Sequence, residues 1–324
     1  MSHSHHVPMG LRRVWTLLFA FTPWLTSVAW PLQGLPAESS VTAAPTAAWI
    51  DRDRGLIRNA QQLHLNAAQV GSLWTRLGAE YQDRAMFTES EAAYNRGLAM
   101  LEREPEARST YALALGNLGS LYMLTHRLDA AERCRRRSLE IYERLGDATA
   151  IARAKGYLGG VYLTMRRNKD AASFASQAIQ GFAAASDEAG DDRTAAMLIY
   201  AYASCMSNNC ADGLRTAEEA ISFIKAQSPV SSRSLGQAHV ALGFAEQRTG
   251  NMQKAGDDIR EGVRILDELL PPTHPLLLGA LETYRKYLTE NHRESEAAEV
   301  ADRQRRATEG AACSHCTVSV EGLR

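Results

Sequence analysis

The chain has 324 residues, enough for two ordinary domains or one long repeat array. Its formal net charge is −1, which excludes a global electrostatic field that would favour nucleic acid or an anionic membrane surface. Aromatic residues make up only 7% of the chain, which suits close helix packing better than sheet surfaces, and five cysteines are too few for a disulfide scaffold.

The N-terminus has the pattern of an export signal. Two arginines precede the uncharged, mostly apolar segment 14–30, which offers small residues suited to cleavage after Ala29. We therefore expect a signal peptide over residues 1–29, a flexible linker over 30–47, and a mature protein that is periplasmic or secreted. The alternative is an uncleaved anchor in the inner membrane, formed by residues 14–37.

Small residues then recur with a long and nearly constant spacing. Alignment on a Leu-Gly pair, first seen in LWTRLGAEY at residues 73–81, gives six copies. The residue at the Gly site, position 8 of each copy, is Gly78, Gly119, Gly159, Ala201, Gly243 and Arg285, so the steps are 41, 40, 42, 42 and 42 residues. We expect six helical repeats over residues 66–306, preceded by a capping helix over 48–65.

Two further registers of small residues support the same repeat. Twelve residues after position 8 the copies have Ser90, Ala131, Ala171, Gly213, Ala255 and Ala297, and seven residues further on they have Gly97, Ser138, Ala178, Ala220, Gly262 and Gln304. Sixteen of these eighteen sites are Gly, Ala or Ser. Because a bare backbone lets a second helix approach closely, we expect these sites to lie where two helices pack together.

Turn residues divide each repeat into two helices. Gly at helix ends and Pro at helix starts predict first helices near 66–82, 107–124, 148–165, 191–206, 232–248 and 274–290. Second helices are predicted near 88–103, 128–145, 169–185, 211–226, 252–269 and 294–308. The last repeat departs from the pattern at Arg285 and Gln304, as an end cap is expected to do, and residues 307–324 are predicted to form a flexible tail.

The first copy resembles the tetratricopeptide repeat, whose pattern is W-x2-L-G-x2-Y followed by Ala and an aromatic residue. The matching residues are Trp74, Leu77, Gly78, Tyr81 and, in the second helix, Tyr94. The usual repeat of the family has about 34 residues, whereas the longer repeats here, with PPTHPLLLGALETY at 271–284, are similar to those of kinesin light chains. The resemblance implies an all-α fold, an α-α superhelix (solenoid) of about six helix-turn-helix repeats.

The resemblance also implies a partner-binding groove, because in this family the first helices line a concave face. The family's contact positions correspond to Leu113, Asn117, Ser120, Met123, Arg153, Tyr157, Leu163, Leu198, Tyr202 and Phe244. The Lys and Asn that hold a C-terminal carboxylate in chaperone-binding members are missing, so Asn117 and Arg153 are the best remaining polar pair. The surrounding apolar side chains favour an apolar partner segment over an acidic one.

A structural role is the alternative for the same residues. The apolar groove residues would then be core between neighbouring repeats, Asn117 would bond the backbone of a neighbouring helix, and Arg153 would be solvated.

Two cysteine pairs carry candidate chemistry. The motif CSHC at 313–316 offers three zinc ligands, one short of a closed structural site, and it lacks the βαβ setting of a redox Cys-x-x-Cys. Cys205 and Cys210 straddle the turn of the fourth repeat and would cross-link its helices in an oxidising compartment.

A run of arginines is the remaining feature. The segment ERCRRRSLEIYER at 132–144 places five arginines on one second helix. The i,i+4 pairs Glu132–Arg136 and Glu140–Arg144 are typical of a solvated convex face, and no aromatic platform for nucleic acid accompanies them.

We found no metalloprotease, P-loop, nucleophile-elbow or dinucleotide motif. The sequence therefore predicts an exported, non-catalytic scaffold without cofactor or metal, which binds a protein or peptide partner along the concave face. Nucleic acid is not expected, and a membrane is expected only if the N-terminal segment is an anchor. The alternatives are a scaffold that self-associates into a homo-oligomer and a thiol- or metal-binding protein that acts through Cys313 and Cys316.

Overall fold

The computed structural model describes residues 47–185 and 190–314, and the side chains of 49–185 and 190–309. All regular secondary structure in these ranges is helical, as predicted. The expected signal peptide, the alternative anchor and the linker up to residue 46 lie outside the described residues.

The helices follow the predicted repeats. After α1 (Ala47–Arg58), the first helices are α2 (Ala67–Asp83), α4 (Arg108–Leu124), α6 (Ala148–Thr164), α8 (Gly190–Met206), α10 (Ser232–Thr249) and α12 (Pro275–Glu290). The second helices are α3 (Phe87–Leu101), α5 (Leu128–Leu145), α7 (Asn168–Ala184), α9 (Cys210–Lys225), α11 (Met252–Leu269) and α13 (Glu294–Ser314), and a short 3₁₀ helix, η3 (Pro105–Ala107), precedes α4.

Two bounds differ from the prediction by more than two residues. The leading helix α1 ends at Arg58, and turns follow it up to residue 64. The last helix α13 continues to Ser314, so the first part of the predicted flexible tail is helical.

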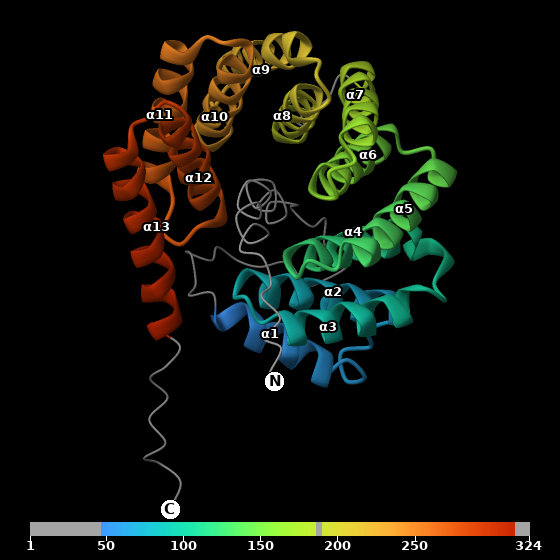
Figure 1. Cartoon of the computed structure of the whole chain (residues 1–324). Helices are drawn as coiled ribbons and strands as arrows, with labels where there is room; N and C mark the ends of the chain where they lie inside the picture. The colour runs from blue at the N-terminus through green and yellow to red at the C-terminus, as the bar shows by residue number, and fades with distance from the viewer. Residues whose placement is uncertain (1–46, 186–189, 315–324) are drawn as a thin grey trace, which may run out of the picture. The chain divides into compact units, whose positions relative to one another are not determined.

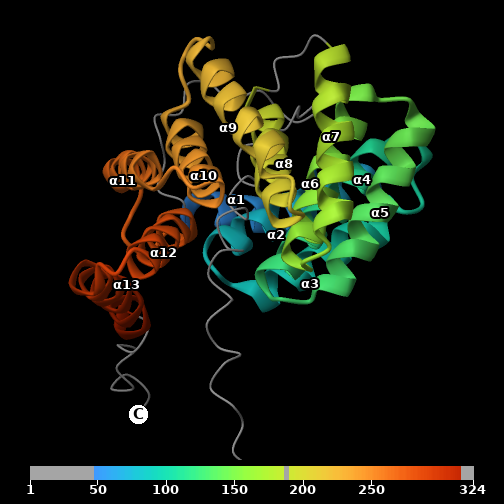
Figure 2. The same cartoon turned by 45° about the horizontal axis from the view of Figure 1, so that its top comes forward.

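The described helices form two compact units that divide within α8, between Ala196 and Met197. The N-terminal unit contains α1 to α7 and the start of α8, and the C-terminal unit contains the rest. Inside each unit, a second helix lies against the first helix of its own repeat, as α4 with α5 and α10 with α11 (Figure 1). The view in Figure 2 shows the same pairing for α6 with α7 and for α12 with α13.

The small residues of the three registers lie where the helices meet. All sixteen of them are buried. A Cβ atom added at Gly78 would come 2.7 Å from the ring of Tyr94 in α3, and one added at Gly243 would come 2.7 Å from the carbonyl oxygen of Ala255 in α11. The structure therefore confirms that these sites are bare because a second helix packs directly on them.

Each turn between a first and a second helix also repeats. One residue in every such turn is left-handed, with φ between 56° and 91°, and it always lies seven residues after position 8: Ala85, His126, Arg166, Asn208, Gly250 and His292. The next backbone N–H donates to the carbonyl five residues back, as from Arg127 to Tyr122 at 2.8 Å. This Schellman-type arrangement ends the first helix in the same way six times.

The leading helix α1 packs on the first repeat. Ile50 is buried in one cluster with Leu77 and Tyr81 of α2. Asp53 of α1 is fully buried and accepts a hydrogen bond from Nε of Arg76 at 2.5 Å. Apolar contact and a buried ion pair together fix α1 at the end of the N-terminal unit.

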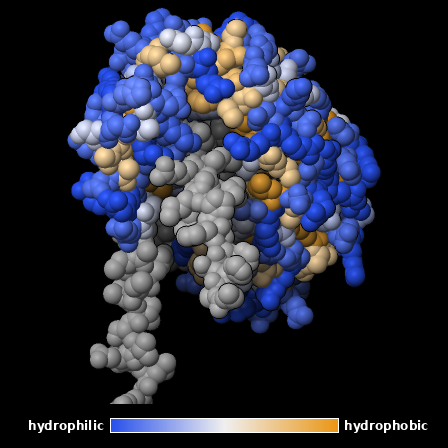
Figure 3. All heavy atoms as spheres, in the orientation of Figure 1, coloured by the Kyte–Doolittle hydropathy of each residue, from blue (hydrophilic) through white to orange (hydrophobic). Residues whose placement is uncertain are grey.

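The surface is mainly hydrophilic in the view of Figure 3, and apolar side chains form small separate patches. The large hydrophobic residues that are exposed in the described ranges lie at helix ends and in turns: Leu63, Leu145, Met206, Val230, Met252 and Leu269. Among the described helices, none combines the length and the apolar character needed to cross a membrane.

Candidate functional site

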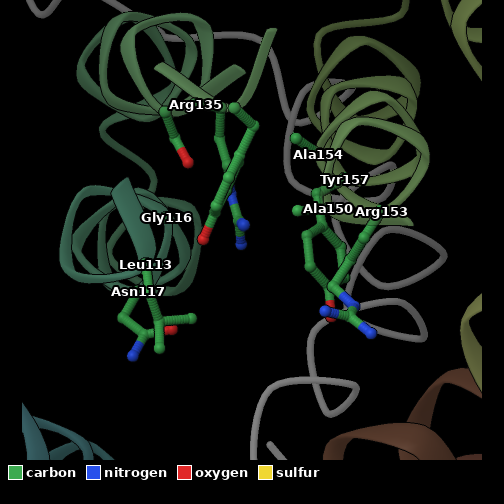
Figure 4. Close-up of a pocket in the computed structure, with 10 residues that line it drawn as sticks. Leu113, Gly116, Asn117, Arg135, Ala150, Arg153, Ala154 and Tyr157 are labelled. Atoms are coloured by element: carbon green, nitrogen blue, oxygen red, sulfur yellow. The ribbon is translucent and has the colours of Figure 1, made fainter. Parts of the chain in front are cut away.

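A hollow in the N-terminal unit gathers polar side chains from three helices. Its empty volume is about 430 Å³, and its lining consists of Leu113, Gly116 and Asn117 from α4, Arg135, Ser138 and Tyr142 from α5, and Ala150, Arg153, Ala154 and Tyr157 from α6. Figure 4 shows the Arg135 side chain reaching into the space between α4 and α6. Four of the predicted groove residues, Leu113, Asn117, Arg153 and Tyr157, thus lie in one hollow.

Asn117 and Arg153 lie on opposite sides of this hollow (Figure 4). The Asn117 side chain is half-buried, and it forms no hydrogen bond with the part of the chain that the structure describes. Arg153 Nε donates to Asp192 Oδ2 at 2.5 Å, and the Tyr157 hydroxyl donates to Asp192 Oδ1 at 3.2 Å. The guanidinium of Arg153 is therefore held in place, whereas the amide of Asn117 is free to bind another group.

Arg135 is the buried cation of the site. Its exposed fraction is 4%, and its guanidinium carbon lies 4.3 Å from the centre of the Tyr157 ring. Its Nη2 donates to the hydroxyl of Ser120, whereas its Nε is buried without a hydrogen-bond partner. Burial lowers the pKa of Arg135 to about 10 and raises the pKa of Tyr157, because desolvation disfavours the charged form of both groups.

The glycines of α4 make room for this arginine. A Cβ atom at Gly119 would lie 3.0 Å from Cγ of Arg135, and one at Gly116 would lie 3.3 Å from its Nη1. Ser138, one turn further along α5, donates to the carbonyl of Ala112 at 2.7 Å and holds α5 against α4. The bare backbone that allows close helix packing elsewhere here allows a long charged side chain to lie along α4.

The sequence-based interpretation of the arginine run on α5 was wrong for Arg135. Glu132 does pair with Arg136 at 2.9 Å on the surface, and Glu140 pairs with Arg137 at 3.0 Å rather than with Arg144. Arg135 is buried against α4 instead, on a face of α5 that lies about 100° around the helix from Arg136.

The repeat register contains the signal that identifies Arg135. It lies sixteen residues after position 8, where the other repeats have Tyr94, Ala175, Ala217, Ile259 and Ala301. The first four of these are buried core residues. A charged residue at a site that is otherwise apolar marks Arg135 as exceptional.

Three predicted groove residues belong to the interior instead. Ser120, Met123 and Leu163 have exposed fractions of only 0%, 8% and 5%. Ser120 accepts from Arg135 and donates to the carbonyl of Gly116 at 3.2 Å, and Met123 packs with Ala131 in α5. In the second and third repeats, positions 2 and 6 line the hollow, whereas positions 9 and 12 pack between helices.

The other predicted groove residues lie in the C-terminal unit. Leu198 and Tyr202 line a second cavity with an empty volume of about 280 Å³, together with Gln237, Val240, Leu266, Leu276 and Ala280. The ring of Phe244 lies 5.0 Å from that of Tyr202, at an angle of 38°. This cavity is more apolar than the hollow in the N-terminal unit, because Gln237 is its only amide and no charged residue lines it.

The cysteines separate into three groups. Cys205 and Cys210 form a disulfide across the turn between α8 and α9. Cys134 is a half-buried free thiol, and burial raises its pKa. Cys313 and Cys316 lie outside the residues whose side chains are described. In the described ranges, no group of three His, Cys, Asp or Glu side chains could hold a metal ion.

Comparison with known proteins supports the repeat. The family model of the tetratricopeptide repeat matches residues 110–184, which run from the third residue of α4 to the end of α7 and contain every residue that lines the hollow. No curated protein has a sequence that matches this chain.

Solved structures with low sequence identity share the fold. The apo form of RapI is 12% identical, with a TM-score of 0.62 over 82% of this chain and 97% of RapI. NprR in complex with its cognate peptide NprX is 12% identical, with a TM-score of 0.59 over 82% of this chain and 76% of NprR. The TPR-like repeats assigned to a kinesin light chain of Podosopora anserina are 14% identical, with a TM-score of 0.52 over 62% of this chain and 96% of that one.

These likenesses agree with the pairing of helices, the buried small residues and the repeating turns. The fold is the all-α helical repeat superhelix. Residues 110–184 match the tetratricopeptide repeat, and the fold of the chain is similar to that of the TPR-like repeats of the kinesin light chain.

Proposed function

We propose that this protein is a non-catalytic scaffold that binds an extended segment of a partner protein at the hollow between α4, α5 and α6. The observation that carries the proposal is the pair formed by Asn117 and Arg153. An unbonded amide and a fixed guanidinium on opposite sides of one hollow can hold the backbone of an extended peptide from both sides. The peptide-bound state of NprR, which has the same fold, supports a peptide as the ligand class.

We further propose that the protein acts after export to the periplasm or the cell exterior. The proposal rests on the charge and hydropathy pattern of residues 1–29 and is supported by the Cys205–Cys210 disulfide, since disulfides persist mainly in oxidising compartments. Fractionation of cells that express the full chain with a C-terminal tag tests it. Mature protein that lacks residues 1–29 in the periplasm or medium is expected, and full-length protein in the cytoplasm would contradict export.

The binding proposal is tested with peptides selected against the purified protein. A displayed library of random peptides is panned on the protein, and the affinity of the selected peptides is measured by fluorescence polarisation. For the double variant Asn117→Ala/Arg153→Ala, we expect at least about tenfold weaker binding, equivalent to roughly 1.4 kcal/mol. The same double variant should change the melting temperature little, because Asn117 has no hydrogen bond to lose within the described residues and the Arg153–Asp192 ion pair is partly exposed to solvent.

A matched control uses the same residue classes outside the hollow. Arg137→Ala/Gln177→Ala removes one guanidinium and one amide from exposed positions on α5 and α7. This variant should bind the selected peptides as tightly as the unmodified protein. Unchanged peptide affinity in the Asn117/Arg153 variant, or failure of the library to give any binding peptide, would contradict the proposal.

A further inference from the structure

The charge of Arg135 is not balanced within the described residues. The groups that act on it electrostatically are Tyr157, Cys134, Tyr142 and Tyr94, and none of them is a carboxylate. Asp192, the carboxylate that bonds the lining of the hollow, already binds Arg153 and Tyr157. A buried cation without a counter-charge is costly, since desolvation is not offset by an ion pair. The hollow thus contains one more positive than negative charge among the described side chains that line or bond it.

The guanidinium of Arg135 also has unused donors. A guanidinium has five N–H groups, and the structure shows a hydrogen bond only from Nη2, to Ser120. Nη1 lies beside Gly116 at the wall of the hollow, where a Cβ atom on residue 116 would come within 3.3 Å of it. Two neighbouring guanidinium nitrogens match the two oxygens of a carboxylate in a bidentate arrangement. The face of Arg135 toward the hollow therefore has the charge and the donors that a carboxylate requires.

A second donor and an apolar wall complete the site. The unbonded amide of Asn117 lines the same hollow and can donate to a second oxygen. Leu113, Ala150 and Ala154 provide apolar surface beside these donors. This combination fits a carboxylate attached to a short apolar group better than it fits the wholly apolar segment that the sequence favoured.

We propose that the hollow is a carboxylate site, in which Arg135 binds a carboxylate group of the partner peptide and Asn117 assists it. This inference rests on the proposed function and specifies the partner group that the hollow recognises. Two sources share this chemistry, the C-terminal carboxylate of a peptide and the side chain of an Asp or Glu residue.

The test uses small probes of known structure. N-acetylleucine presents an α-carboxylate, N-acetylisoglutamine presents a side-chain carboxylate, and N-acetylleucinamide is the neutral match of the first. Binding to the full protein is followed by saturation-transfer NMR and by the shift of the melting temperature, at low and constant ionic strength. At least one acid should bind and raise the melting temperature, whereas the amide should do neither. The acid that binds more tightly shows whether the hollow prefers a C-terminal carboxylate or the side chain of an acidic residue.

The variants assign the effect to Arg135. R135M should abolish acid binding, whereas R137M, which removes an exposed arginine with a side chain 50% exposed on the same helix, should retain it. Without probe, R135M should melt at the same or a higher temperature than the unmodified protein, because it removes an uncompensated buried charge. If R135M does not fold, N117L provides the second test and should weaken acid binding at an unchanged melting temperature.

Two results would overturn the inference. One is equal binding of acid and amide, or no binding of either acid. The other is a lower melting temperature of folded R135M together with unchanged acid binding, which would make Arg135 a structural residue. If the proposed function holds, peptides selected from the library would still bind the protein in both cases. Failure of the carboxylate site can therefore be distinguished from failure of the proposed function.

Discussion

The role of the small residues can be tested by adding one methyl group at two glycines of the N-terminal unit. Gly97, in α3, belongs to the small-residue register, whereas Gly156, in α6, does not. A Cβ atom at Gly97 would lie 2.7 Å from Oγ1 of Thr75 and 2.9 Å from the carbonyl oxygen of Gly71, both in α2. At Gly156 the nearest atoms would be the Cβ atoms of Ala178 and Ala196, at 3.6 and 3.8 Å.

These distances predict opposite changes in stability. Gly→Ala in a helix interior gains about 1 kcal/mol from propensity. At Gly156 the new contacts are ordinary, so G156A should stabilise the protein by roughly 0.5–1 kcal/mol. At Gly97 the methyl group meets backbone of α2, and overpacking of about 1–3 kcal/mol should exceed the propensity gain. Because the propensity gain is common to both variants, we expect G97A to be less stable than G156A by about 1–3 kcal/mol.

The assay is urea unfolding of the full protein followed by far-UV circular dichroism, with midpoints compared at equal slopes. Equal slopes are required because long repeat arrays can lose two-state behaviour. The two variants carry the same added methyl group, so they differ only in what surrounds it. If both variants were stabilised to the same extent, close approach would not be the reason for the small residue at position 97.

Three further changes probe other parts of the fold. Burial and the nearby carboxylate of Asp258 raise the pKa of Glu246 from 4.5 to about 7, so the folded state holds the proton more tightly and stability should fall as pH rises through this range. Glu246→Gln should flatten the curve of melting temperature against pH and stabilise the protein at alkaline pH; parallel curves would refute this. Gly250→Ala should lower the free energy of unfolding in urea by roughly 1–2 kcal/mol, because the φ of residue 250 is 91° and alanine is strained there. No atom lies within 4 Å of an added Cβ, so the cost would come from the backbone and not from a steric clash; a neutral result would show that the turn relaxes. Arg76→Met leaves Asp53 buried without its partner and should cost about 3–5 kcal/mol; limited proteolysis should then cut near α1, and unchanged protection would contradict the role of this ion pair.

Helices and their repeat could be predicted from local signals. The small residues at Gly78, Gly119 and Gly243 repeat every 40 to 42 residues because each repeat must present a bare backbone to its own second helix. Such packing depends on contacts within one helix pair, so one sequence with internal repeats reveals it. The sequence did not indicate the left-handed residues Ala85 and Arg166, since neither is a residue type that favours this conformation.

The candidate site was predicted only in part. Asn117 and Arg153 were recognised because they occupy contact positions of the first helices, and these positions face the hollow. Ser120 and Met123 were placed in the groove by the same rule, yet they are buried because α5 covers that side of α4.

By itself, the sequence determined the all-α repeat, the helix bounds other than the ends of α1 and α13, and the small sites of close packing, because these depend on periodicity along one chain. The tertiary structure decided that Arg135 faces inward and ends beside Tyr157 of the next repeat without a described carboxylate partner. In the sequence it is one of five arginines on a helix whose neighbouring charges form surface pairs. Its hydrogen-bond partner Ser120 and the ring of Tyr157 lie 15 and 22 positions away in the chain, so only the packing of α4, α5 and α6 brings them to Arg135.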